Sequence, residues 1–260
     1  MIIKSIKLEN FRNYESLELS FEKGTNILYG DNAQGKTNVL EAVYLSATTK
    51  SHKGSKDKEM IRFGQEEAHI RTNLDKEGME YRVDMHLKKN KSKGIAIDGV
   101  PIRKASELFG IVNIVFFSPE DLNIIKNGPA ERRRFLDSEI CQLSRLYMIE
   151  LANYNKVVAQ RNKLLKEISF SGRMADTLEI WDEQMVRYGT SIISERKKFI
   201  SRLNDILSEI HQNLTGGKEQ ILITYEPNVS EEAFSEELKA GRERDLRFGQ
   251  SYTGPHRDDF

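Results

Sequence analysis

An eight-residue segment near the N-terminus, Gly30-Asp31-Asn32-Ala33-Gln34-Gly35-Lys36-Thr37, fits the pattern G-x4-G-K-S/T. It follows a short apolar run at 26–29 and precedes residues 39–44, whose apolar side chains recur at helical spacing. Glycines in such a loop allow the backbone to curl so that successive N–H groups point inward and bind an anion. A strand, this loop and a helix in that order are typical of α/β nucleotide-binding folds, so the segment constrains the fold more than any other.

Lys36 and Thr37 supply the side-chain chemistry of this loop. In loops of this kind the lysine ammonium group binds the β- and γ-phosphates, the hydroxyl is a ligand for Mg²⁺, and the helix N-terminus adds partial positive charge. The sequence therefore predicts that a nucleoside triphosphate and Mg²⁺ bind to Gly30, Asp31, Asn32, Ala33, Gln34, Gly35, Lys36 and Thr37. The alternative is a glycine turn with an incidental lysine, which does not explain the strand and helix on either side.

Hydrolysis of the nucleoside triphosphate also requires an acidic residue at the end of a second apolar strand. Glu120 and Asp121 follow the apolar run 110–117, but Ser118-Pro119 intervenes and these acids are typical of a helix start. Glu226 follows residues 221–225, which alternate too strongly for a central strand. We therefore expect the acidic strand to lie beyond residue 260.

The apolar pattern predicts an α/β domain followed by a helical one. Residues 2–30 and 67–98 alternate with a period of two, which indicates strands, and the nearly continuous run 110–117 predicts a central strand covered on both faces. We expect residues 1–118 to form the α/β domain with mixed sheets around the helix that follows the loop. Residues 119–250 are expected to form a helical domain, and 251–260 the start of a return to the first domain.

The helical domain contains two long amphipathic segments. Apolar residues at spacings of three, four and seven run over 136–168 and 178–210, which predicts two long helices that pack against each other as an antiparallel hairpin. A turn is expected at 169–173, a strand at 221–225 and a charged helix at 231–240.

Composition excludes several classes of protein. Lys and Arg number 40, as do Asp and Glu, so the zero net charge excludes binding of nucleic acid through an overall positive charge, although local basic patches are compatible with it. The single cysteine, Cys141, excludes a disulfide framework, and we interpret it as a core residue of the first long helix. No apolar run is long enough to span a membrane and the N-terminus does not resemble a secretion signal, so a cytoplasmic protein is expected.

Several longer motifs follow one another in a characteristic order. KLENFRNYESLELSFEKGTNILYGDNAQGKTNVLEAVYL is followed by SHKGSKDKEMIRFG, FFSPEDLNIIKNGPAERRRFLD, YNKVVAQRNKLLK, WDEQMVRYG and TGPHRDDF. In these motifs the chain resembles the RecF family of DNA replication and repair proteins. The resemblance covers essentially all 260 residues.

The resemblance implies an ABC-type P-loop ATPase head, related to the heads of SMC proteins, with an inserted α-helical domain. It implies ATP and Mg²⁺ as cofactors, with Arg12 and Asn13 as further neighbours of the nucleotide. It also implies binding of single-stranded or gapped DNA, ATP-driven dimerisation, recombinase loading, a link to SOS induction and stalled forks, and partners of the RecR and RecO types.

In that family the signature motif and the acidic Walker B strand follow the GPHRDD segment, where this sequence stops. We therefore expect a chain that binds ATP without efficient hydrolysis. Two other classes remain as alternatives. A P-loop kinase or GTPase would carry a base-specificity motif or an acceptor site, and we find neither. An SMC-like structural scaffold would carry far longer helices.

Three basic clusters are candidates for DNA contacts, since mobile cations bind phosphates. The first contains Lys88, Lys89, Lys91 and Lys93, with Arg103 and Lys104 nearby; the second contains Lys50, Lys53, Lys56 and Lys58 with His52; the third is Arg132-Arg133-Arg134. Each cluster is equally explained as part of a solvated surface without a ligand. The arginine cluster is also explained by ion pairs within the helical domain.

The closing residues His256, Arg257, Asp258 and Asp259 admit two interpretations: a metal or acid–base site, or a structural polar network at the domain junction. A single histidine without a second cluster of ligands favours the network. The remaining histidines are scattered and show no metal-binding spacing.

Overall fold

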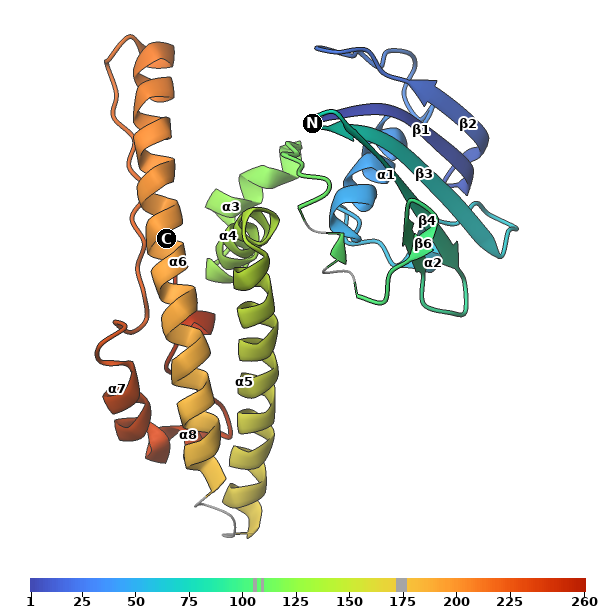
Figure 1. The fold of residues 1–260 in the computed structure, drawn as a ribbon. Helices are drawn as coiled ribbons and strands as arrows, with labels where there is room; N and C mark the ends of the chain where they lie inside the picture. Colours follow the sequence, from blue (N-terminus) through green and yellow to red (C-terminus); the bar gives the residue numbers. More distant parts are fainter. Residues whose placement is uncertain (105–106, 109, 172–176) are drawn as a thin grey trace. The chain divides into compact units, whose positions relative to one another are not determined.

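The computed structural model describes residues 1–104, 107–108, 110–171 and 177–260 and divides the chain into two compact units, Met1–Phe117 and Ser118–Phe260 (Figure 1). The expected boundary after residue 118 lies one residue from this division. Residues 251–260 fall within the second unit, and their expected return to the first domain remains a prediction.

The first unit contains a six-stranded antiparallel sheet with the strand order β2-β1-β3-β4-β5-β6. Its strands are β1 (Ile2–Phe11), β2 (Tyr14–Ser20), β3 (Glu67–Lys76), β4 (Met79–Lys88), β5 (Gly94–Ile97) and β6 (Val100–Pro101). Successive side chains of a strand point to opposite faces, and in β3 and β4 the alternation buries one face and leaves the other accessible. This confirms the period-two prediction for 67–98.

Helix α1 (Lys36–Thr48) packs on the buried face of this sheet (Figure 1). Its apolar residues Val39, Ala42 and Leu45 are buried with side chains of β1, β3 and β4. The hydroxyl groups of Ser46 and Thr72 hydrogen-bond at 2.8 Å within this core, so a polar contact fixes α1 against β3. A short helix, α2 (Asp57–Met60), precedes β3.

Two expected strands of the first unit are absent. Residues 26–29 and 110–117 contain no strand, and Val115 and Phe117 are 91% and 79% exposed, so the prediction of a central strand covered on both faces is wrong. A strand requires hydrogen bonds to a neighbour, and neither segment has a partner strand among the described residues. Only part of the run is core: Val112 is buried, and Ile111 and Ile114 pack against the core cluster.

The second unit is helical. Its elements are a 3₁₀ turn η2 (Pro119–Leu122), α3 (Asn123–Lys126), α4 (Pro129–Leu143), α5 (Arg145–Ser171), α6 (Leu178–Thr215), α7 (Phe234–Ala240), α8 (Arg242–Phe248) and a 3₁₀ turn η4 (Pro255–Arg257). Helices α5 and α6 lie side by side along most of the length of α5 (Figure 1), which confirms the predicted hairpin. No helix in the described part of the chain is long and apolar enough to cross a bilayer.

The first long helix is interrupted, which the periodicity did not predict. Ser144 separates α4 from α5 with extended backbone angles, φ −134° and ψ 106°. Its hydroxyl accepts a hydrogen bond of 3.1 Å from the backbone N–H of Tyr147, so Ser144 caps the start of α5. Cys141 is buried in α4, which confirms its interpretation as a core residue.

The expected turn and strand in the second unit also differ from the structure. Residues 169–171 continue α5, while 172 and 173 lie outside the described residues. Residues 221–225 form no strand; instead, the side-chain amide of Asn204 in α6 donates to the carbonyl of Ile223 at 2.8 Å and accepts from its N–H at 2.9 Å. A side chain thus takes the place of a partner strand. The charged helix expected at 231–240 begins at Phe234.

Candidate functional site

The loop Gly30–Thr37 leads from residues 26–29 into α1 and contains three left-handed positions. The φ angles of Gly30, Ala33 and Gly35 are 139°, 65° and 101°. Gly35 is the N-cap of α1, and a Cβ atom there would lie 2.5 Å from the Tyr14 hydroxyl oxygen and 2.7 Å from Asn13 Oδ1. Glycine is therefore required at position 35 both by backbone conformation and by space.

Lys36 lies against the backbone of the same loop. Its Nζ donates to the carbonyl oxygens of Gly30 at 2.7 Å and Asp31 at 2.5 Å. Thr37 is exposed one residue into α1, and the first turn of this helix contains no acidic residue. Backbone N–H groups at a helix start, an ammonium group and a hydroxyl are the donor set that a triphosphate with Mg²⁺ requires, so the residues present fit this ligand.

The strand connection β1–β2 contacts the loop from one side. Asn13 Nδ2 and the Tyr14 hydroxyl each donate to the carbonyl of Gln34 at 3.2 Å. Asn38, in the first turn of α1, donates to Asn13 Oδ1 at 2.9 Å. The structure thus brings Asn13 next to the loop, and its expected position beside the nucleotide stays a prediction.

Arg12 makes a two-pronged ion pair with Glu41, a buried residue of α1. Its Nε and Nη2 donate to the two Glu41 oxygens at 2.8 and 2.6 Å. Burial raises the pKa of Glu41, but hydrogen bonds from Arg12 and Ser51 and the charges of Arg12 and Lys53 outweigh it, so the pKa lies below its usual value. Nη1 of Arg12 also donates to the carbonyl of Glu59, so Arg12 ties α1 to the end of α2.

A cavity of about 970 Å³ adjoins this side of the loop. The predicted nucleotide neighbours Arg12 and Asn13 line it together with Asn38. Lys53, Lys58 and Lys89 line it as well, so the structure brings residues of the first two basic clusters together beside the candidate nucleotide site. The ring of Phe63, also in its wall, is fully exposed.

Several of the predicted DNA contacts are paired with acids. Lys89 binds Glu66 at 2.8 Å, Lys93 binds Asp57 at 2.7 Å, and Lys53 lies 4.0 Å from Glu41. Lys56 precedes α2, where its backbone N–H donates to Glu59 at 2.9 Å. Lys91 is exposed and Lys88 is partly exposed. The basic surface near the cavity therefore contains both paired and solvated cations.

The third basic cluster stabilises the helical unit. Arg132 binds both oxygens of Asp259, at 2.5 and 2.8 Å, and Arg133 donates to the carbonyl of Asp258 at 2.6 Å. Arg134 is exposed and lies 3.2 Å from Glu131 in the same helix. Arg132 thus makes an internal ion pair of the kind that was the alternative to DNA binding, and Arg133 makes an internal hydrogen bond to the backbone.

The closing residues belong to a polar network whose partners among the described residues lie in the second unit. The place of this network at the domain junction, as expected from the sequence, stays a prediction. The Asp258 carboxylate accepts hydrogen bonds from Arg196 at 2.9 Å, from the Asn228 backbone at 2.8 Å and from the Tyr225 hydroxyl. Arg196 is 2% exposed and also binds Asp137 at 2.7 Å. Asp258 therefore connects the last residues to α6 through Arg196. Because Arg196 also binds Asp137, the network extends to α4.

His256 is neutral in this network. Its Nε2 lies 3.0 Å from the carbonyl of Ser251, which only accepts, so Nε2 carries the proton and Nδ1 accepts from the Tyr154 hydroxyl at 2.7 Å. Burial, opposed by the Ser251 carbonyl, lowers the pKa of His256 to about 4. No metal-binding group of three side chains includes His256 among the described residues.

The two acidic positions considered for hydrolysis have local roles in the second unit. The Asp121 carboxylate accepts from the backbone N–H of Ser118 at 2.5 Å and so caps the turn η2. Glu226 pairs through its backbone with Asp259. Neither ends a strand.

Two positioning residues were not found from the sequence, Tyr14 and Glu41. Tyr14 gave no signal, since an aromatic residue in an alternating strand is ordinary. Glu41 did give one: it lies within the otherwise apolar segment 39–44 and is fully buried. A charged residue among apolar ones on a helix requires a partner of opposite charge.

Comparisons with known proteins identify the family of the chain. The AAA domain family matches residues 5–244. The proteins named DNA replication and repair protein RecF from Agathobacter rectalis and Lachnoclostridium phytofermentans are 61% and 58% identical over all of this chain, which covers 72% of each. A solved structure described as the recombination mediator protein RecF-ATP in the RecFOR pathway matches with a TM-score of 0.93 and 34% identity, over 99% of this chain and 72% of that one.

Proposed function

Because the chain belongs to the RecF family of DNA replication and repair proteins, we propose that it binds ATP with Mg²⁺ at Gly30–Thr37 and, in that state, binds DNA in the cytoplasm during recombinational repair and replication-fork maintenance. One observation carries the proposal: the loop that opens α1 places backbone N–H groups, Lys36 and Thr37 at one point. The relatives include a structure described as RecF-ATP, which supports ATP as the nucleotide.

In the proposed complex each group of the loop has a separate task. The N–H groups at the start of α1 bind phosphate oxygens, and Lys36 exchanges its hydrogen bonds to the Gly30 and Asp31 carbonyls for the terminal phosphates. Thr37 holds Mg²⁺, which neutralises phosphate charge. Asn13 and Tyr14 keep the Gln34 carbonyl in place and so preserve the loop conformation.

The proposed DNA surface lies in the first unit beside this site. Lys53, Lys58 and Lys89 line the cavity next to Arg12 and Asn13, so nucleotide and DNA contacts share one wall. Single-stranded or gapped DNA is the proposed substrate, and the exposed ring of Phe63 offers a surface on which an unpaired base stacks. ATP-dependent dimerisation, recombinase loading with RecR- and RecO-type partners, and a role in SOS induction complete the proposal.

A salt titration of DNA binding tests the basic surface. Charge reversal at Lys88, Lys89 and Lys91 leaves DNA phosphates without their cations, so in the presence of Mg-ATP it should weaken binding of gapped DNA. The slope of log K against log salt should also flatten, by roughly one for each phosphate that is no longer neutralised. Fluorescence anisotropy at several salt concentrations measures both quantities.

The matched control reverses Lys23, Lys163 and Lys218, three exposed lysines that belong to none of the three basic clusters. Equal affinity and equal slope for the Lys88/89/91 variant and the native chain would remove this patch from the DNA surface. Weakening of the same size in both triple variants would show only an effect of net charge.

A further inference from the structure

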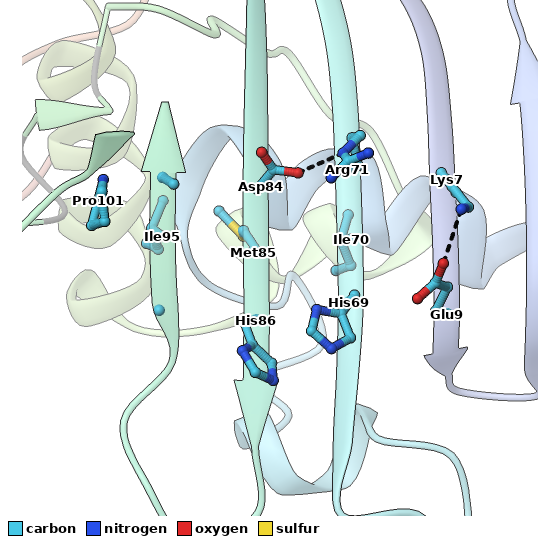
Figure 2. Close-up of a pocket in the computed structure, with 12 residues that line it drawn as sticks. Lys7, Glu9, His69, Ile70, Arg71, Asp84, Met85, His86, Ile95 and Pro101 are labelled. Carbon is cyan, nitrogen blue, oxygen red and sulfur yellow. Dashed lines mark hydrogen bonds and ion pairs between the residues drawn. The ribbon is translucent and has the colours of Figure 1, made fainter. Parts of the chain in front are cut away.

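A row of polar residues crosses the sheet face opposite α1. In the β1–β3 ladder Glu9 is paired with His69, and in the β3–β4 ladder His69 is paired with His86. Figure 2 shows the two imidazole rings side by side on neighbouring strands. Glu67 lies two residues before His69 and therefore on the same face of β3.

The three side chains Glu67, His69 and His86 are already in contact. The Glu67 carboxylate lies 2.8 Å from His86 Nε2 and 3.8 Å from His69 Nε2. The two rings stack with their centres 4.0 Å apart. One oxygen or nitrogen atom from each residue lies within 4.8 Å of the other two. Among the described residues no other three side chains of this kind are so close.

We propose that Glu67, His69 and His86 bind a divalent transition-metal ion, with zinc as the preferred ion. Two imidazole nitrogens and one carboxylate oxygen are a known donor set for zinc, and three protein ligands leave a coordination position for water. Imidazole donors favour zinc, copper and nickel over magnesium and calcium, which prefer oxygen ligands. The site is therefore distinct from the Mg²⁺ position proposed at Thr37.

Binding requires side-chain rotation only. Ligand atoms about 2.1 Å from a tetrahedral zinc ion lie about 3.4 Å from each other. The 2.8 Å contact between Glu67 and His86 must therefore widen and the longer separations must close, each by less than about 1.5 Å. The side chains of Glu67, His69 and His86 are 54%, 43% and 30% exposed, so the core does not hold them in their present rotamers. The β3–β4 ladder already fixes the spacing of their Cα atoms.

The surroundings leave the ion accessible, and the cation that faces the group across the β3–β4 ladder is Lys88, opposite Glu67. His69 and His86 line a hollow of about 280 Å³ (Figure 2), and the next residue in the row, Gly94 of β5, has no side chain to fill it. The cations nearest in this hollow are paired: Lys7 binds Glu9 at 2.9 Å, and Arg71 binds Asp84 at 2.6 Å. Glu9, opposite His69, adds a second carboxylate to the row.

The bound ion would join β3 to β4 and so stabilise the sheet. A ligand that binds the folded state and not the unfolded state raises the unfolding midpoint. This inference rests on the sheet face alone and not on the proposed nucleotide or DNA binding.

The test uses the full 260-residue chain without nucleotide. Competition with a chromophoric chelator should show one zinc ion bound per chain, and Co²⁺ should give the visible absorption of a low-coordinate site. His69→Ala and His86→Ala should each weaken zinc binding at least tenfold. The control, His211→Ala, changes a histidine of α6 and should leave zinc binding unchanged.

Two further readouts keep the result interpretable. Circular dichroism without metal establishes that each variant folds, and zinc should raise the unfolding midpoint of the native chain but not of the His69→Ala/His86→Ala double variant. Absence of stoichiometric zinc binding by the native chain would overturn the proposal, as would a double variant that binds zinc with native affinity.

Discussion

At the scale of single residues, the candidate site depends on conformations that few residue types adopt. Gly35 has φ 101° at the start of α1, with Tyr14 and Asn13 against its missing side chain. Lys36 reaches back to the Gly30 and Asp31 carbonyls only because the loop curls at these positions. The motif indicates these residues from the sequence alone because their chemistry and their conformation are both encoded locally.

Gly35→Ala should therefore lower ATP affinity by at least tenfold. The added methyl group requires movement of Tyr14 and Asn13, which hold the Gln34 carbonyl, and it strains the backbone at a positive φ. Titration with a fluorescent ATP analogue measures the effect. The control is Gly24→Ala: this residue also has a positive φ but nothing within 4 Å of its Cβ position. Native affinity in Gly35→Ala would show that the close approach has no role in binding.

The partners of the site's ionic residues were beyond prediction from sequence. Arg12 and Glu41 are 29 positions apart, and Arg196 and Asp258 are 62 apart. Residue patterns reveal local periodicity, whereas such pairs depend on which elements the tertiary fold brings together. The resemblance implies Arg12 as a neighbour of the nucleotide, whereas its two-pronged pair with Glu41 is visible only in the structure.

At the scale of elements, the helices were easier to predict than the strands. The α5–α6 hairpin followed from an apolar pattern contained within each helix, and buried residues such as Tyr154 and Ile192 confirm it. The strands expected at 26–29, 110–117 and 221–225 have apolar sequences but no partner strand among the described residues. A helix satisfies its own backbone groups, whereas a strand depends on another segment.

Close packing within the helical unit gives a prediction at Gly189 of α6. A Cβ atom there would collide with the Phe234 ring of α7 and lie 3.1 Å from Tyr154 of α5. Alanine favours a helix over glycine by about 1 kcal/mol, but overpacking of a core costs about 1–3 kcal/mol. Gly189→Ala should therefore lower the free energy of unfolding, by about 1 kcal/mol, in a urea titration.

A second variant identifies the cause. Phe234→Leu removes the ring that the new methyl group meets, so Gly189→Ala should cost less in that background than in the native one. A Gly189→Ala variant as stable as the native chain, or more stable, would contradict this prediction. It would show that the gain in helix propensity outweighs the steric cost of a methyl group between α6 and α7.

At the scale of the whole molecule, the two units are stabilised differently. The first buries one apolar face of a sheet under α1. The second also buries ionic networks: Arg161 is inaccessible to solvent and binds Asp182 at 2.6 Å and Asp245 at 2.7 Å, which joins α5, α6 and α8. Breaking such a pair from one side leaves an uncompensated buried charge.

The partly buried, neutral His256 makes the second unit sensitive to acid. Its pKa is about 4 in the folded chain against 6.5 for an ordinary histidine, so the unfolded state binds more protons between these values. Stability is therefore fully present above about pH 6.5 and decreases as the pH falls toward 4. Between about pH 7 and about pH 4.5 this residue alone should remove about 2 kcal/mol of unfolding free energy.

Urea titrations across this pH range measure the decrease in unfolding free energy, with the circular dichroism of the helices as the signal. His256→Gln has an amide that can donate to Ser251 and accept from Tyr154 but does not titrate. Between about pH 7 and about pH 4.5 this variant should therefore lose about 2 kcal/mol less unfolding free energy than the native chain. Parallel pH profiles for the native chain and His256→Gln would contradict the assignment of a neutral imidazole at position 256.

The central claim is that Gly30–Thr37 binds Mg-ATP through Lys36, and isothermal titration calorimetry tests it most directly. The native chain should bind one Mg-ATP with measurable heat, and Lys36→Ala should weaken this binding at least tenfold while it keeps the same fold by circular dichroism. A folded native chain that gives no heat with Mg-ATP, or a Lys36→Ala variant with native affinity, would contradict the account.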